Sequence, residues 1–277
     1  MFSVSRTASR GLIGRSKLAA FGTSMGKSKM STVTYPTKEV EGKPVPEVTF
    51  HNRTAEDWDL INSKEFFKGK NVVAFSLPGA FTPTCSTSHL PRYEQLAKAF
   101  KANGVDEIVC LSVNDGFVMK SWGEDQKITE VKLLADGAGE FTRGMGMLCD
   151  KSAIGFGDRS WRYSMYVKDG VVDKVFSEPM QEGDPFVVSD ADTMFKYVCP
   201  DAKIPPSTLL YVKKGCPFCH EAMELLTKKG FSYETVVVGE DVSSTALRAV
   251  ANAATVPQVF MDGKLIGGAD DLKKHFA

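Results

Sequence analysis

The sequence predicts an α/β protein of two domains, each built on a mixed β-sheet flanked by helices. The chain has 277 residues, and at roughly 150 residues per domain this length suggests two domains. Short apolar runs typical of buried strands alternate with segments that have helical periodicity. A proline-rich stretch, 200–206, separates two such series, because proline neither continues a helix nor enters a central strand.

The first series follows an extended arm that begins near Gly42. We expect strands and helices in alternation at 71–77 (strand), 85–100 (helix), 108–113 (strand), 117–127 (helix) and 131–135 (strand). Two β-rich runs, 161–168 and 171–176, flank Asp169-Gly170, the strongest hairpin signal in the chain. A helix at 191–198 closes this domain, which we place at 31–199.

The second series occupies 207–277 and has the order β-α-β-α-β-β-α. The elements are expected at 208–212, 219–229, 233–238, 243–254, 258–261, 265–266 and 270–276, with Asp262-Gly263 as the turn of the hairpin.

Composition excludes several classes of protein. Lysine plus arginine and aspartate plus glutamate both number 34, so no overall basic charge points to nucleic acid. No apolar run approaches the ~18 residues that span a bilayer, and we expect no membrane partner. Six cysteines in a chain of this length are too few for a disulfide-rich secreted scaffold.

Residues 1–30 differ from the rest of the chain. They contain six basic residues and no acidic one, and they are rich in serine and threonine. This pattern is typical of an organelle transit peptide, mitochondrial first and plastid second. The alternative is a basic tail that carries no targeting signal. A translation start at Met25 or Met30 would leave a cytosolic form.

Cys216 and Cys219 form a C-x-x-C redox motif directly after a predicted strand, at the start of a helix. Free backbone N–H groups and the positive helix end favour the thiolate of Cys216, as do Lys213 and Lys214 just upstream. The alternative is half of a zinc site. A structural zinc needs four ligands, and no second C-x-x-C is present, so we expect no metal.

Residues 207–277 resemble dithiol glutaredoxins in three motifs. These are Lys-Lys-Gly-Cys-Pro-Phe-Cys (213–219), Thr-Val-Pro (255–257) and Gly-Gly-Ala-Asp-Asp (267–271). The resemblance implies a cis proline and a glutathione site. The residues it assigns to binding glutathione are Lys213, Thr255, Val256, Pro257, Ala269 and Asp270.

Cys85 follows a Pro/Gly-rich turn, 78–84, at the first turn of a predicted helix, where the thiolate is again favoured. A buried structural cysteine is the alternative. The polar, kinked neighbourhood argues against burial in an apolar core. Thr82 can donate a hydrogen bond to the sulfur or to an incoming oxygen.

Residues 38–198 resemble type-five peroxiredoxins, chiefly in Pro-Gly-Ala-Phe-Thr-Pro-Thr-Cys-Ser (78–86) and Arg-Tyr-Ser-Met (162–165). The resemblance gives both domains a thioredoxin-like fold. It implies that Cys85 is the peroxidatic nucleophile, that Thr82 is its hydroxyl partner and that Arg162 orients the peroxide. Arg159 is the competing arginine nearby.

One departure from the family concerns the resolving cysteine. Many relatives carry it near the position of Val188, but residues 186–189 of this chain include no cysteine, so we expect no two-cysteine cycle within the first domain. Of the remaining cysteines, Cys110 fits a packing role in a strand. Cys149 and Cys199 lie next to loop-like segments, which leaves their exposure open, but neither has an activating group and we interpret both as structural or incidental.

The two resemblances together imply a peroxiredoxin–glutaredoxin hybrid, a glutathione-dependent thiol peroxidase for hydrogen peroxide and organic hydroperoxides. Glutathione would be its reducing co-substrate, with no bound cofactor. Such hybrids form homo-oligomers, which we expect here by resemblance only. The alternatives are a peroxide sensor that relays oxidation to client proteins and, less favoured because Cys219 is not serine, an iron–sulfur carrier.

Overall fold

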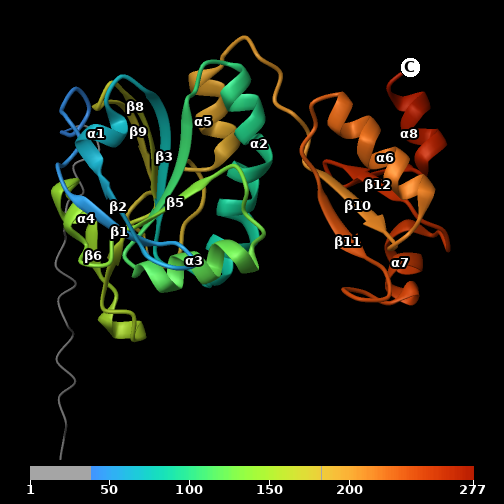
Figure 1. Cartoon of the computed structure of the whole chain (residues 1–277), viewed down its shortest axis with the longest axis horizontal. Helices are drawn as coiled ribbons and strands as arrows, with labels where there is room; N and C mark the ends of the chain where they lie inside the picture. The colour runs from blue at the N-terminus through green and yellow to red at the C-terminus, as the bar shows by residue number, and fades with distance from the viewer. Residues whose placement is uncertain (1–38, 182) are drawn as a thin grey trace, which may run out of the picture. The chain divides into compact units, whose positions relative to one another are not determined.

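The computed structural model describes residues 39–181 and 183–277, so the transit-like segment 1–30 lies outside the described residues. Within the described ranges, no helix is both long enough and apolar enough to cross a membrane. Two main sheets organise this part of the chain, one before residue 180 and one after residue 207. Figure 1 shows both sheets with their helices.

The first main sheet has five strands in the order β5-β4-β3-β8-β9. Its parallel part is β3, β4 and β5, and its antiparallel part adds β8 and β9. The bounds are β3 (Asn71–Leu77), β4 (Glu107–Ser112), β5 (Lys132–Ala135), β8 (Tyr163–Lys168) and β9 (Val171–Ser177). The predicted mixed sheet is therefore confirmed.

Side chains of β3 alternate between two apolar layers, as the period of two in a strand requires. Val73, Phe75 and Leu77 belong to the layer that packs with three helices, α2 (Leu90–Ala102), α3 (Gly116–Asp125) and α5 (Ala191–Val198). Val72 and Ala74 belong to the opposite layer. That layer packs against α1 (Ser63–Phe67), α4 (Glu140–Gly144), β1 (Thr49–Arg53) and β2 (Trp58–Asn62). Figure 1 shows α2 and α5 on one side of this sheet and α1 and α4 on the other.

Several short elements were not predicted. They are the β1–β2 hairpin, α1, α4, a 3₁₀ turn (Ser152–Ile154), and the pair β6 (Leu148–Asp150) and β7 (Asp158–Ser160). In β1 only Phe50 is buried, and in β2 only Ile61. One buried apolar residue per strand gives no alternating hydrophobic pattern. The formation of these two strands therefore depends on packing with the rest of the domain, which the sequence pattern does not show.

The second main sheet has four strands in the order β11-β10-β12-β13, again parallel on one side and antiparallel on the other. Its strands are β10 (Thr208–Val212), β11 (Glu234–Val237), β12 (Gln258–Met261) and β13 (Lys264–Gly267). Its helices are α6 (Pro217–Lys228), α7 (Ser244–Ala251) and α8 (Ala269–His275). The predicted order of elements is confirmed. The segment between α5 and β10 contains neither helix nor strand, and the domain boundary at 200–206 stays a prediction.

Both predicted Asp-Gly hairpins are present. Asp169 and Gly170 have φ values of 47° and 74°, and Asp262 and Gly263 have 48° and 72°. A two-residue turn with both φ angles positive matches the twist of the flanking strands, and this is why Asp-Gly suits it.

Candidate active sites

Cys85 lies at the start of a single π-helical turn (Cys85–His89), which runs directly into α2. The side chain is fully buried and belongs to the apolar layer that contains Phe75 and Leu77. The expectation that the polar turn keeps Cys85 out of the apolar core is therefore wrong. The turn residues themselves are partly exposed, but the π-helical turn directs the sulfur inward against the sheet.

Arg162 reaches the Cys85 sulfur from the residue before β8, the antiparallel neighbour of β3. Its Nη1 lies 3.6 Å from Sγ of Cys85, and the side chain is only 1% exposed. Nη2 donates to both carboxylate oxygens of Asp184, at 2.7 and 2.6 Å. Burial opposes the charge of Arg162, but the negative charges of Cys85 and Asp184 outweigh it and raise the pKa of the guanidinium.

His89 supports the same guanidinium from the opposite end of the π-helical turn. Its Nδ1 lies 3.1 Å from Arg162 Nη1, and its Nε2 lies 3.1 Å from the carbonyl of Ser189. Burial, together with the nearby Arg162 charge, lowers the pKa of His89 to about 3. The ring is therefore neutral, and the hydrogen bonds assign the proton to Nε2 and the acceptor role to Nδ1.

The turn before Cys85 is held by a hydrogen bond within the turn and by one to the loop that follows β4. The Thr82 hydroxyl donates to the carbonyl of Gly79 at 2.8 Å, and the Ala80 amide donates to Oδ1 of Asn114 at 3.0 Å. The competing arginine, Arg159, donates from Nε to the carbonyl of Phe156. Of the two candidate arginines, it is thus Arg162 that contacts the sulfur.

A loop at 183–189 completes the surroundings of Arg162. Glu178 is 2% exposed, and its carboxylate accepts backbone N–H groups at 2.8–2.9 Å from three successive residues, Val187, Val188 and Ser189. The same loop supplies Asp184 and places the Phe186 ring 5.6 Å from the guanidinium carbon of Arg162. Sequence reasoning missed Glu178, Asp184 and this loop, since no motif marked them.

The other three cysteines before residue 200 are buried. Cys110 is 0% exposed, Cys149 6% and Cys199 4%, so neither Cys149 nor Cys199 has the exposure that the sequence left open. Cys149 lies in β6, and Cys199 packs in the same apolar layer as α5. Burial raises the pKa of Cys110 and of Cys199, which disfavours their thiolate forms.

Cys216 is the N-cap of α6, and this explains why the helix begins at Pro217, two residues before its expected start. Its Sγ accepts the Cys219 amide at 3.3 Å and lies 3.9 Å from the carbonyl of Val256. Cys216 is partly exposed, whereas Cys219 is 1% exposed. Burial, reinforced by the hydrogen bond with Cys216, raises the pKa of Cys219 to about 11.

The residues assigned to glutathione lie around this motif. The Val256–Pro257 peptide bond is cis, as the resemblance implies. The Thr255 carbonyl accepts the side-chain amide of Gln258, and the Lys213 carbonyl accepts the Cys216 amide. Ala269 and Asp270 open α8, and the Asp270 carboxylate is exposed and paired with Lys273 at 3.2 Å.

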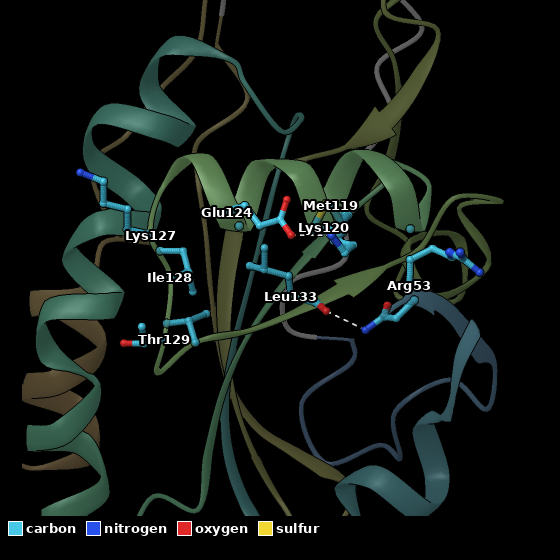
Figure 2. A pocket seen from close by; sticks show the side chains of 12 residues that line it. Arg53, Met119, Lys120, Glu124, Lys127, Ile128, Thr129 and Leu133 are labelled. Atoms are coloured by element: carbon cyan, nitrogen blue, oxygen red, sulfur yellow. Dashed lines mark hydrogen bonds and ion pairs between the residues drawn. The ribbon is translucent and has the colours of Figure 1, made fainter. Parts of the chain in front are cut away.

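A separate depression of about 400 Å³ lies between α3 and β5 (Figure 2). Its lining includes Arg53, Lys127 and the ion pair of Lys120 with Glu124, and it contains no cysteine. Two of its lining residues are joined by a hydrogen bond, in which the side-chain amide of Asn52 donates to the carbonyl of Leu133. We assign it no part in the thiol chemistry.

Comparison with known proteins gives the family. The Redoxin family matches residues 40–195, and the Glutaredoxin family matches 208–266. A hybrid peroxiredoxin of Haemophilus influenzae, hyPrx5, is 56% identical over 238 residues, covering 86% of this chain and 99% of the relative. The chain belongs to the peroxiredoxins and carries a C-terminal glutaredoxin domain.

Further relatives match the peroxiredoxin part. Peroxiredoxin-2B of Arabidopsis thaliana is 45% identical over 129 residues, covering 46% of this chain and 78% of the relative. The crystal structure of reduced Prx3 from Vibrio vulnificus in complex with hydrogen peroxide is 44% identical, with a TM-score of 0.54, and covers 57% of this chain and 98% of that one. The 1-Cys peroxiredoxin of Plasmodium falciparum is 35% identical, with a TM-score of 0.55 and coverages of 58% and 99%.

Proposed function

We propose that this peroxiredoxin is a glutathione-dependent thiol peroxidase that reduces hydrogen peroxide and organic hydroperoxides. The observation that carries the proposal is the pairing of Cys85 with Arg162 in a domain whose other cysteines are all buried. A thiol from outside that domain is then needed to regenerate Cys85. The glutaredoxin domain supplies a partly exposed sulfur, Cys216, and the residues that the family uses for glutathione.

In the first step, the Cys85 thiolate attacks one oxygen of the hydroperoxide and the O–O bond breaks. Cys85 becomes a sulfenic acid, and the leaving oxygen takes up a proton to give an alcohol or water. Arg162 stabilises the negative charge that moves from sulfur to the leaving oxygen. Its Nε is buried and has no hydrogen-bond partner among the described residues, so it is a spare donor for that oxygen.

Glutathione then condenses with the sulfenic acid, giving a mixed disulfide on Cys85 and one water. The Cys216 thiolate attacks the glutathione sulfur, which frees Cys85 and moves glutathione to Cys216. A second glutathione releases Cys216 and leaves as oxidised glutathione. Cys219 offers a second route through a Cys216–Cys219 disulfide. The cycle consumes two glutathione molecules for each hydroperoxide.

Steady-state kinetics with glutathione as the only reductant test the proposal. We expect Cys85→Ser to abolish turnover, and Cys216→Ser to slow turnover while leaving the first reduction of peroxide intact. Cys219→Ser is the matched control, since it removes the neighbouring thiol but keeps the attacking sulfur. Unchanged steady-state turnover in Cys216→Ser would contradict the role given to the glutaredoxin domain.

We also propose a mitochondrial location and a homo-oligomeric state. The basic, acid-free composition of residues 1–30 supports the first, and the family resemblance supports the second. A fluorescent protein fused after residue 38 should enter mitochondria, and a fusion that starts at Met30 should stay in the cytosol. Sedimentation of the full chain should give a mass above the 30.2 kDa of one copy.

A further inference from the structure

Arg162 is a buried cation that faces two acidic groups. Nη1 points to the Cys85 sulfur at 3.6 Å, and Nη2 is occupied by both oxygens of Asp184. The remaining neighbour, His89, is neutral because burial holds its pKa at about 3. With Cys85 as a thiolate, this group of side chains therefore carries one net negative charge.

Asp184 differs from the other members of the group in its exposure. Its side chain is 45% exposed, whereas Arg162 is 1% exposed and Cys85 is fully buried. The carboxylate thus stands between solvent and the guanidinium. The loop that carries it is held on its C-terminal side by three backbone hydrogen bonds to the buried carboxylate of Glu178.

An anionic group is usually attracted to a guanidinium, because two parallel N–H donors match a carboxylate. Here Asp184 already sets both of its carboxylate oxygens against one nitrogen of the guanidinium, Nη2. A second carboxylate brought in with a substrate would meet a negative charge in place of a free cation. A neutral hydroperoxide carries no such penalty, and it still finds the buried Nε of Arg162 without a partner among the described residues.

We propose that Asp184 is a specificity-determining residue of the peroxidase site: its carboxylate occupies the anion-binding face of Arg162 and so selects neutral hydroperoxides over those that carry a carboxylate close to the peroxide group. The proposal rests on the peroxidase activity of Cys85 and is independent of the reductant. It concerns which substrate enters and leaves the oxidation step unchanged.

The test uses a charged and a neutral form of one peroxide, 3-hydroperoxy-3-methylbutanoate and its methyl ester, which differ in charge and by one methyl group. Second-order rate constants for oxidation of the reduced full-length protein are measured with each, without glutathione. Wild type should react faster with the ester. In Asp184→Asn the ratio of ester to acid rate constants should fall about tenfold, because a unit charge a few ångströms from the incoming carboxylate has been removed.

The ratio separates specificity from damage to the site. A loss of Cys85 reactivity slows both peroxides and cancels in the ratio. Asp184→Glu keeps the charge and should restore the wild-type ratio, and Glu56→Gln, an exposed acid in the β1–β2 turn, should leave it unchanged.

Three results would overturn the proposal. The first is an equal loss of both rates in Asp184→Asn with the ratio preserved, which would reduce Asp184 to a structural support. The second is a wild type that already prefers the acid. The third is a wild type that reacts with neither peroxide although hydrogen peroxide still oxidises Cys85. A protein that does not react with hydrogen peroxide either would also lose the peroxidase role of Cys85.

Discussion

Replacing Arg162 with lysine keeps a positive charge but removes the geometry that the site requires. The two terminal nitrogens of Arg162 serve different partners, Nη1 the Cys85 sulfur and His89, and Nη2 the carboxylate of Asp184. Lysine has a single nitrogen and cannot serve both. Because the bonds to Asp184 are the shorter, at 2.6 and 2.7 Å, we expect the ammonium to pair with Asp184 and to leave the sulfur.

The distance to the sulfur sets the size of the effect. At an effective dielectric constant of about 20, unit charges 3.6 Å apart interact by roughly 4–5 kcal/mol. Lysine keeps part of this energy at a longer distance, so we expect a loss of about 3 kcal/mol in the oxidation step. This corresponds to a fall of about 10²-fold in the rate constant for hydrogen peroxide.

Stopped-flow fluorescence of the reduced protein measures this rate. Trp122 is fully buried and donates from Nε1 to the hydroxyl of Ser86, the residue after Cys85, so its emission should report oxidation of the sulfur. Chemical denaturation of the variant checks that the fold is retained. A folded Arg162→Lys protein that reacts within threefold of wild type would refute the argument that the guanidinium fork is needed.

Three other outcomes follow from buried groups. Glu178→Ala leaves three backbone N–H groups of residues 187–189 without their acceptor, and denaturant unfolding should show a loss of about 2–4 kcal/mol in the free energy of unfolding. An unchanged unfolding midpoint would contradict the stabilising role of the Glu178 carboxylate. His89 is neutral in the fold, with a pKa of about 3, so between pH 6.5 and 3 only the unfolded chain binds the proton. The free energy of unfolding should therefore decrease by up to about 1.4 kcal/mol for each unit that the pH falls in this range. His89→Asn should lack that slope in pH-dependent unfolding curves. Cys219, with its pKa raised to about 11, should resist alkylation by iodoacetamide at neutral pH while Cys216 reacts; mass mapping that finds Cys219 modified first would reverse their roles.

The elements that sequence predicted well are those whose signal is local. Asp169-Gly170 defines its turn because both residues adopt the positive φ that a tight hairpin needs. Cys216 caps α6 only a few residues after β10 ends at Val212. The β1–β2 hairpin lacks such a signal. Each of its strands buries one side chain, and its pairing depends on packing against the rest of the domain.

The candidate site was predictable only in part, for a similar reason. Cys85 is marked by its turn, and the resemblance adds Arg162, but the contact between them joins residues 77 positions apart. Asp184 contacts Arg162 from the loop at 183–189, and Glu178 holds that loop by accepting hydrogen bonds from its backbone. No sequence motif marks either residue. The π-helical turn at Cys85 also has no sequence signature, and it is this turn that buries a sulfur expected to lie outside the core.

In the proposed cycle, glutathione carries oxidation from Cys85 to the glutaredoxin domain. The most direct measurement is peptide-mapping mass spectrometry of Cys216→Ser after one equivalent of hydrogen peroxide followed by glutathione. We expect a glutathione adduct that persists on Cys85 in this variant and is cleared in the wild type. A disulfide between Cys85 and another cysteine of the protein, with no glutathione adduct, would contradict it.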